Sequence, residues 1–278
     1  KAAELLIPGS GDGGGGSAVL GTPGPDGFIY AVRPGGRDFD KESKIGWRRP
    51  ERQPLVQSEM VSAPVLDRAS NTVVVTSEDG NLYAYDAASG QLRDGFPFQA
   101  GDKIWSTPVI RDGVIYFGSH DKNVYAVFLD SGNIKWEFAT DGVVAARPLL
   151  FKNQVIVGSF DQNLYSLNVL DGSLRWKEKG INWFWAGAVT DGRTIFAASM
   201  DGNIYALDSG GNLLWKHDMG SPIVSVPVLT PEGLVVAAKN GALNVLDTTN
   251  RDIGPQRVIY SPALRVSDIL APLQVSGS

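Results

Sequence analysis

One short motif recurs six times along the chain, and its spacing constrains the fold more than any other feature. In five copies an Asp begins a tight turn and a tyrosine follows four residues later; the tyrosines are Tyr30, Tyr83, Tyr125, Tyr165 and Tyr205. The sixth copy has Asn240 and Asn244 at these positions. After a first interval of 53 residues, successive copies are 39 to 42 residues apart. A period near 40, built only from strands and turns, is typical of the blades of a β-propeller.

Each period contains four predicted strands. In the period 104–138 these are residues 104–110, 114–119, 124–128 and 133–138. Asp, Asn and Gly occupy the turns between them, and β-branched and aromatic residues fill the strands. A single sheet of this size exposes both faces, so it needs neighbouring sheets to bury them. The sequence therefore predicts an all-β fold, a single β-propeller of four-stranded antiparallel blades.

The two ends of the chain determine the expected number of blades. Residues 267–275 have the pattern of a first strand, but no second strand follows, whereas residues 17–22 have the pattern of a second strand without a clear first. Pairing the C-terminal strand with the N-terminal blade would close six blades. Residues 4–7 could instead provide the first strand, and the C-terminal segment would then open a seventh blade.

The composition is that of one large domain after a short lead-in. The chain has 278 residues, of which 43% are hydrophobic, and this is enough for one sizeable core. Residues 9–17 consist only of Gly, Ser and Asp, so we expect residues 1–16 to be a flexible lead-in and residues 17–278 to form the propeller. The absence of cysteine excludes disulfides, thiolate metal sites and cysteine nucleophiles. A net charge of −5 argues against a general nucleic-acid binder, and no apolar run is long enough for a membrane span.

Two segments carry a resemblance to a known family. Residues 80–90 read Gly-Asn-Leu-Tyr-Ala-Tyr-Asp-Ala-Ala-Ser-Gly, and residues 203–215 read Asn-Ile-Tyr-Ala-Leu-Asp and end at Trp215. They resemble the pyrroloquinoline-quinone-like (PQQ-like) repeat, which runs Tyr-Ala-Leu-Asp, a Gly turn and an outer-strand Trp. The resemblance covers residues 17–275. The family includes quinoprotein dehydrogenases, which use adjacent cysteines and a Glu, Asn and Asp set for calcium, and this chain matches neither feature.

The chain is therefore more similar to the BamB-like, non-catalytic branch of that family. This resemblance implies a non-enzymatic, extracytoplasmic scaffold, periplasmic or on the cell surface, that binds other envelope or surface proteins. It implies no catalytic residue, no metal, no cofactor and no direct membrane span. Two alternatives stay open: a PQQ-dependent or other small-molecule dehydrogenase-type propeller, and a cell-surface or filament structural module.

The polar residues of the turns favour structural roles. The Asp-x-Asn turns at residues 121–123, 161–163 and 201–203 lack the longer run of alternating oxygen ligands that a calcium loop needs, so we interpret them as hairpin turns. His120 and His217 have no partners nearby in the sequence for a metal site or a catalytic triad, and we expect both to be surface residues.

Large residues interrupt the small apolar pattern of the predicted first strands. Trp105 and Trp185 occupy equivalent positions, Trp183 lies just upstream, and Arg147 directly precedes Pro148. First strands line the central channel of a propeller, so these four residues are candidates for an aromatic, basic channel mouth that binds a ligand or partner. The alternative is that the tryptophans fill space between blades.

A second candidate surface lies in an insertion in the first blade. It is locally basic on an acidic protein, and its cations are Arg33, Arg37, Lys41, Lys44, Arg48, Arg49 and Arg52. Loops on rigid scaffolds often carry function, so we predict a partner surface here. Four acidic residues are interleaved, and the alternative is a solvated loop whose charges pair among themselves.

Overall fold

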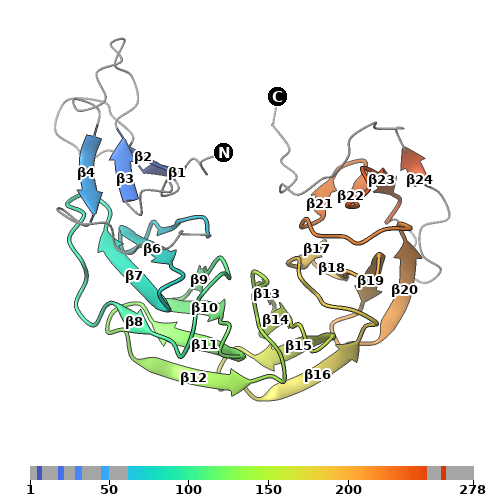
Figure 1. Ribbon diagram of the computed structural model, residues 1–278, viewed down its shortest axis with the longest axis horizontal. Helices are drawn as coiled ribbons and strands as arrows, with labels where there is room; N and C mark the ends of the chain where they lie inside the picture. The colour runs from blue at the N-terminus through green and yellow to red at the C-terminus, as the bar shows by residue number, and fades with distance from the viewer. Residues whose placement is uncertain are drawn as a thin grey trace, which may run out of the picture. The chain divides into compact units, whose positions relative to one another are not determined.

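The structure, a computed structural model, describes residues 62–248 together with residues 5–7, 18–21, 29–32, 45–49 and 258–260. The described residues form strands, turns and connections, with no helix among them, which confirms the all-β prediction (Figure 1). Consequently this part of the chain has no helix that is long and apolar enough to cross a membrane. The chain divides into two compact units: unit 1 is Lys1–Asp121 with Tyr125–Glu137, and unit 2 is Lys122–Val124 with Phe138–Ser278.

The described strands form six four-stranded sheets, and in each sheet the strands follow chain order from one edge to the other. The first three sheets are β1 (Leu5–Ile7), β2 (Ala18–Gly21), β3 (Ile29–Val32) and β4 (Ile45–Arg49); β5 (Val65–Asp67), β6 (Thr72–Thr76), β7 (Asn81–Asp86) and β8 (Phe98–Gln99); and β9 (Val109–Arg111), β10 (Val114–Gly118), β11 (Asn123–Phe128) and β12 (Ile134–Ala139). The other three are β13 (Leu149–Phe151), β14 (Gln154–Gly158), β15 (Asn163–Asn168) and β16 (Leu174–Lys179); β17 (Val189–Thr190), β18 (Ile195–Ala198), β19 (Asn203–Leu207) and β20 (Leu213–Asp218); and β21 (Val228–Thr230), β22 (Gly233–Ala237), β23 (Leu243–Leu246) and β24 (Val258–Tyr260). Six sheets are compatible with six blades.

The N-terminal sheet corrects the expected pairing of residues 267–275 with residues 17–22. Strand β1 pairs with β2, with Leu5 opposite Leu20, and β3 takes the other edge of β2. The alternative first strand, residues 4–7, is therefore the one that the structure has, and it lies within the segment expected to be a lead-in. A local hairpin closes a short loop at a smaller entropic cost than pairing the two ends of the chain. Residues 267–275 lie outside the described residues.

The Asp that begins each repeat motif holds its turn together. In each of four copies the tyrosine hydroxyl donates to the Asp Oδ2 atom, at 2.7 Å for Tyr83 and Tyr125 and at 2.6 Å for Tyr165 and Tyr205. For Asp121, Asp161 and Asp201 the same oxygen also accepts a backbone N–H from the connection that leaves the preceding sheet, for example at 3.0 Å from Asp141 to Asp161. The motif thus ties a hairpin to its neighbouring sheet, which is the structural reading of the Asp-x-Asn turns.

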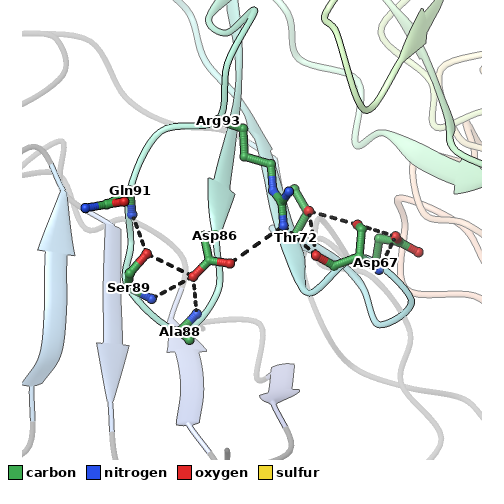
Figure 2. A network of polar contacts seen from close by, with 8 residues as sticks. Asp67, Thr72, Asp86, Ala88, Ser89, Gln91 and Arg93 are labelled. Carbon is green, nitrogen blue, oxygen red and sulfur yellow. Dashed lines mark hydrogen bonds and ion pairs between the residues drawn. The ribbon is translucent and has the colours of Figure 1, made fainter.

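A second polar residue of the repeat closes the turn after the third strand. At the end of β7, the Oδ1 atom of Asp86 accepts from the Ala88 and Ser89 N–H groups at 3.1 and 2.8 Å, and its Oδ2 atom lies 3.6 Å from Arg93 (Figure 2). Asp208 does the same after β19, where its Oδ1 atom accepts from Gly210 at 2.8 Å. The Tyr-Ala-x-Asp sequence therefore encodes two successive turns, one at each end of the third strand.

The core consists of side chains from the second and third strands of adjacent sheets. In unit 2, Phe196, Ile204 and Trp215 pack with Leu234 and Val236 of the next sheet, and all five are buried. The outer-strand aromatics expected from the sequence take part: Trp136, Trp215 and Phe96 are buried, and Trp176 is half-buried. The indole N–H of Trp176 donates to Ser209 O at 3.1 Å, which connects β16 to the turn between β19 and β20. In unit 2, adjacent sheets therefore share an apolar core.

Replacing Asp161 by Ala tests the structural role of the repeat motif. The substitution leaves the Tyr165 hydroxyl and the N–H groups of Asn163 and Asp141 without their acceptor. We expect a loss of about 2–3 kcal/mol in the free energy of unfolding, measured by urea denaturation at pH 7. Asp171→Ala is the matched control, because this exposed carboxylate accepts only from the Ser173 backbone and side chain in its own turn. It should leave the denaturation midpoint nearly unchanged.

The effect of Asp161→Ala should depend on pH. Desolvation by itself would raise the pKa of Asp161. The hydrogen bonds from Tyr165, Asn163 and Asp141 outweigh this effect and hold the pKa below its usual value. A carboxylate with a lowered pKa contributes stability that is complete above its unfolded pKa of about 4, and this stability is lost as the pH falls through the folded value. The difference in unfolding free energy between wild type and Asp161→Ala should therefore shrink below about pH 4. An equal difference at pH 7 and pH 3 would contradict this assignment.

Candidate functional site: an exposed apolar patch in unit 2

The connections between successive sheets can be compared residue by residue, because each is fixed by the same backbone hydrogen bond. Thr140 N–H donates to Lys122 O at 2.9 Å, and Gly180 N–H donates to Gln162 O at 2.8 Å. In this register Ile181 takes the place of Gly101, Asp141 and Gly220, and Trp183 takes the place of Lys103, Val143 and Pro222. The connection 180–186 therefore carries two large apolar side chains where the other repeats have small, polar or aliphatic residues.

Three aromatic rings stack in this connection and the turn beside it. The Phe160 ring lies 4.5 Å from Trp183, with 6° between the planes, and 5.3 Å from Trp185, with 20° between the planes. Trp183 is 40% exposed and Ile181 is 71% exposed, whereas Phe160 and Trp185 are half-buried. We call Phe160, Ile181, Trp183 and Trp185 the apolar patch.

The backbone beneath the apolar patch is held on several sides. Phe184 is fully buried and packs edge-on against Tyr205, with 5.3 Å between ring centroids. The Trp183 carbonyl accepts the Met200 N–H at 2.8 Å, and the Ile181 N–H donates to Asp201 at 3.2 Å. These contacts hold the backbone of the connection, on which Ile181 and Trp183 are exposed. The patch is therefore an apolar surface on a hydrogen-bonded connection.

Trp105 lies in unit 1 and is engaged by its neighbours. Its indole N–H donates to Glu78 Oε1 at 2.8 Å, and its ring lies 4.1 Å from the His120 ring at 70°. These contacts, together with its half-buried position, fit the packing interpretation of this tryptophan. The other three channel-mouth candidates belong to unit 2, so a single mouth formed by all four residues remains a prediction.

Arg147 is a positively charged residue of unit 2 that lies just before strand β13. Its side chain is exposed, yet it has enough protein around it that desolvation lowers the pKa of its guanidinium. A guanidinium stays protonated at physiological pH even so, and Arg147 therefore remains a cation there. The structure describes no contact between Arg147 and Trp183 or Trp185.

The basic insertion of the first blade falls largely outside the described residues. Arg48 and Arg49 lie in strand β4, for which the structure describes only the backbone. The remaining cations, Arg33, Arg37, Lys41, Lys44 and Arg52, lie outside the described residues. The partner surface expected there stays a prediction.

The two histidines differ from the expected surface positions. His120 and His217 are both half-buried, and the Nε2 atom of each is buried without a hydrogen-bond partner among the described residues. Desolvation lowers the pKa of both imidazoles, so both are neutral at pH 7. The reason is packing: His120 packs against Trp105, and His217 lies on the more buried face of β20. Within the described residues, no group of three or more His, Asp or Glu side chains could hold a metal ion.

Sequence reasoning identified Trp183 and Trp185 but missed Phe160 and Ile181. The sequence contained a signal for both. Phe160 directly precedes the turn Asp, where other copies have Glu78, His120 and Met200. Ile181 likewise replaces a glycine or an aspartate. Comparing repeats position by position, and not only along the first strands, would have found them.

The family to which the chain belongs follows from its repeats. The family model PQQ_2, described as outer membrane protein assembly factor BamB, matches residues 37–179 and 178–254, which together are more than half of the chain. The chain belongs to this family. The expected PQQ-like repeat is thereby confirmed, and the matched residues include the motif copies that contain Tyr83, Tyr125, Tyr165 and Tyr205. No curated protein matches the chain.

Solved structures show the same fold at low sequence identity. BamB from Moraxella catarrhalis matches with a TM-score of 0.72 and 14% identity, over 94% of this chain and 77% of that one. The computationally designed Ika8 protein matches with a TM-score of 0.74 and 18% identity, over 94% and 75%. Quinohemoprotein alcohol dehydrogenase from Comamonas testosteroni matches with a TM-score of 0.63 and 15% identity, over 74% of this chain and 43% of that enzyme. At such identities the likeness concerns the fold alone, and it agrees with the predicted propeller class.

Proposed function

We propose that this BamB-family chain is a non-enzymatic scaffold of the cell envelope that docks another protein through the apolar patch. The observation that carries the proposal is the exposure of Ile181 and Trp183 on a connection whose backbone is fixed from both sides. An exposed tryptophan on a rigid support loses little conformational entropy on binding and buries a large apolar area, which is typical of an interface anchor.

The family supports the kind of partner and the compartment. BamB is described as an assembly factor for outer membrane proteins, so a protein partner in the periplasm or at the envelope surface is the partner class that this membership favours. The protein carries a net charge of −5, which disfavours nucleic acid as the partner. A patch of two exposed apolar side chains above two half-buried rings suits a protein anchor better than a polar ligand.

The quinone-enzyme alternative fits the residues poorly. A quinone held with calcium needs a cluster of carboxylate and amide oxygens, and the sequence offers no Glu, Asn and Asp set that can be matched to that of the quinoprotein dehydrogenases. Quinoprotein dehydrogenases use adjacent cysteines, and this sequence contains no cysteine. We therefore assign no reaction step to the chain.

Photo-crosslinking in the native host tests the docking proposal. A benzoylphenylalanine placed at Ile181 or Trp183 should form an adduct with one defined protein. The same group at Asp141 or Val143, the equivalent positions of the preceding connection, is the matched control and should give little adduct. An adduct pattern that is equal at all four positions, or no protein adduct at positions 181 and 183, would contradict the proposal.

A further inference from the structure

Strand β16 carries a row of positive charge that its counterparts lack. Along its exposed face, alternate residues are Arg175, Lys177 and Lys179, and all three side chains are exposed. Measured from the outer-strand tryptophans, the same positions hold Lys135, Glu137 and Ala139 in β12, and Leu214, Lys216 and Asp218 in β20. The row of three cations is therefore peculiar to β16 among these strands.

The row is accessible and largely free of counter-charges. β16 is the last strand of its sheet, so one of its edges has no neighbouring strand within the sheet. Within the described residues, none of the three cations forms an ion pair; Lys179 Nζ donates to the Asp161 carbonyl at 3.0 Å. Arg175 influences exposed Asp171, whose pKa is lowered mainly by hydrogen bonds from Ser173 and to a smaller extent by Arg175. Glu178 lies on the other, half-buried face of the strand.

The cation row leads directly into the apolar patch. Two residues after Lys179 comes Ile181, and two residues further comes Trp183. Lys177 and Lys179 are alternate residues of a regular strand, about 6.7 Å apart, and Arg175 is the extra residue of a bulge at the start of β16. This order, charge on a strand followed by an apolar anchor on the connection that leaves it, gives a partner segment two kinds of contact.

We propose that β16 and the apolar patch together bind an extended acidic segment of the partner protein, with carboxylates at alternate residues and an aromatic or aliphatic residue at one end. This inference rests on the proposed docking function and names the chemistry of the partner. An extended chain repeats its side chains at the spacing of Lys177 and Lys179, and the bulge that carries Arg175 provides a third cation beside them. Exposed ion pairs contribute little each, so the patch provides the anchor and the row selects the partner.

A protein segment fits this row better than a large polyanion does. The chain as a whole is acidic, and an anionic membrane or a nucleic acid would meet the repulsion of its entire surface. A short segment touches only the three cations and the patch, where the local charge is positive. Anionic vesicles and heparin are therefore the competing ligands that the experiment includes.

Peptide selection against the full chain tests the inference. Twelve-residue peptides displayed on phage and selected on the chain should be enriched in Asp or Glu at alternate positions beside an aromatic or aliphatic residue. A fluorescent copy of a selected peptide should bind the Arg175→Gln/Lys177→Gln/Lys179→Gln variant about tenfold more weakly at low salt, and this difference should shrink in high salt. The control Lys152→Gln/Lys216→Gln/Lys239→Gln removes the same charge from exposed positions elsewhere in unit 2 and should bind like wild type.

The outcomes distinguish the docking proposal from the acidic-segment inference. Peptides without acidic enrichment, no selected peptide, or equal binding to both triple variants would overturn the acidic-segment inference. Binding of heparin or anionic vesicles with the same dependence on the three cations would make the row a general polyanion site and would also overturn it. If Trp183→Ala abolishes partner crosslinking while the cation variant retains it, docking stands and only the acidic segment fails. If neither variant affects crosslinking, both proposals fail.

Discussion

Gly132→Ala should destabilise the protein far more than Gly113→Ala, although the two glycines have nearly the same backbone conformation. Both have positive φ, +68° for Gly132 and +71° for Gly113, and both lie in turns between strands. Alanine in this left-handed region costs about 1–2 kcal/mol at either position. The difference lies in what a Cβ atom would meet.

At Gly132 a Cβ atom would collide with the backbone of the neighbouring sheet. It would lie 2.1 Å from the Gly95 carbonyl oxygen, whereas at Gly113 nothing lies within 4 Å. Because the obstacle is backbone, the two turns must move apart, and the contact between adjacent sheets of unit 1 is lost. We expect at least about 3 kcal/mol in total for Gly132→Ala, or a fall in melting temperature of roughly 10 °C, against about 3–4 °C for Gly113→Ala.

Thermal unfolding followed by circular dichroism measures both variants under the same conditions. Equal shifts for the two substitutions would show that the close approach of Gly95 and Gly132 does not support the fold. Because the mutated turns lie in unit 1, the result also tests whether the stacking of successive sheets, and not each sheet alone, provides the stability.

The sequence predicted the repeated parts of the fold well because their chemistry is local. The Asp of each motif and the tyrosine four residues later determine one turn, as the hydrogen bond from Tyr205 to Asp201 illustrates. The outer-strand tryptophans were also predicted, because they recur at a fixed place in each repeat. The first strand of the N-terminal sheet was assigned to the wrong end of the chain, because a three-residue strand such as Leu5–Ile7 carries too little pattern to outweigh a longer segment with a proline in register.

The candidate site was predicted only in part, because it depends on contacts between repeats. Trp183 and Trp185 stood out from the first strands, but their stacking partner Phe160 comes from the hairpin of the preceding sheet. Trp105 has the same place in its repeat as Trp185, yet Glu78 and His120 engage it. Equivalent positions in a repeat thus acquire different roles from the neighbouring repeat, which no single segment of sequence reveals.

Removing the exposed anchor should separate binding from folding. Ile181→Ser/Trp183→Ala takes away the two exposed side chains of the apolar patch and leaves the buried Phe184 and the backbone hydrogen bonds of the connection in place. The loss of one ring stack on Phe160 costs about 1 kcal/mol, so the melting temperature should fall by no more than about 5 °C. An interface tryptophan commonly contributes 2 kcal/mol or more, so the affinity should fall by roughly 30-fold or more.

The most direct test uses the partner that crosslinks to a probe at position 181 or 183. Isothermal calorimetry measures its binding to wild type and to Ile181→Ser/Trp183→Ala. Val143→Ala, at the position equivalent to Trp183 in the preceding connection, is the control and should bind like wild type. The dissociation constant should be at least about 30-fold higher for the double variant, with its fold retained. A folded double variant that binds the partner as tightly as wild type does would contradict the docking proposal.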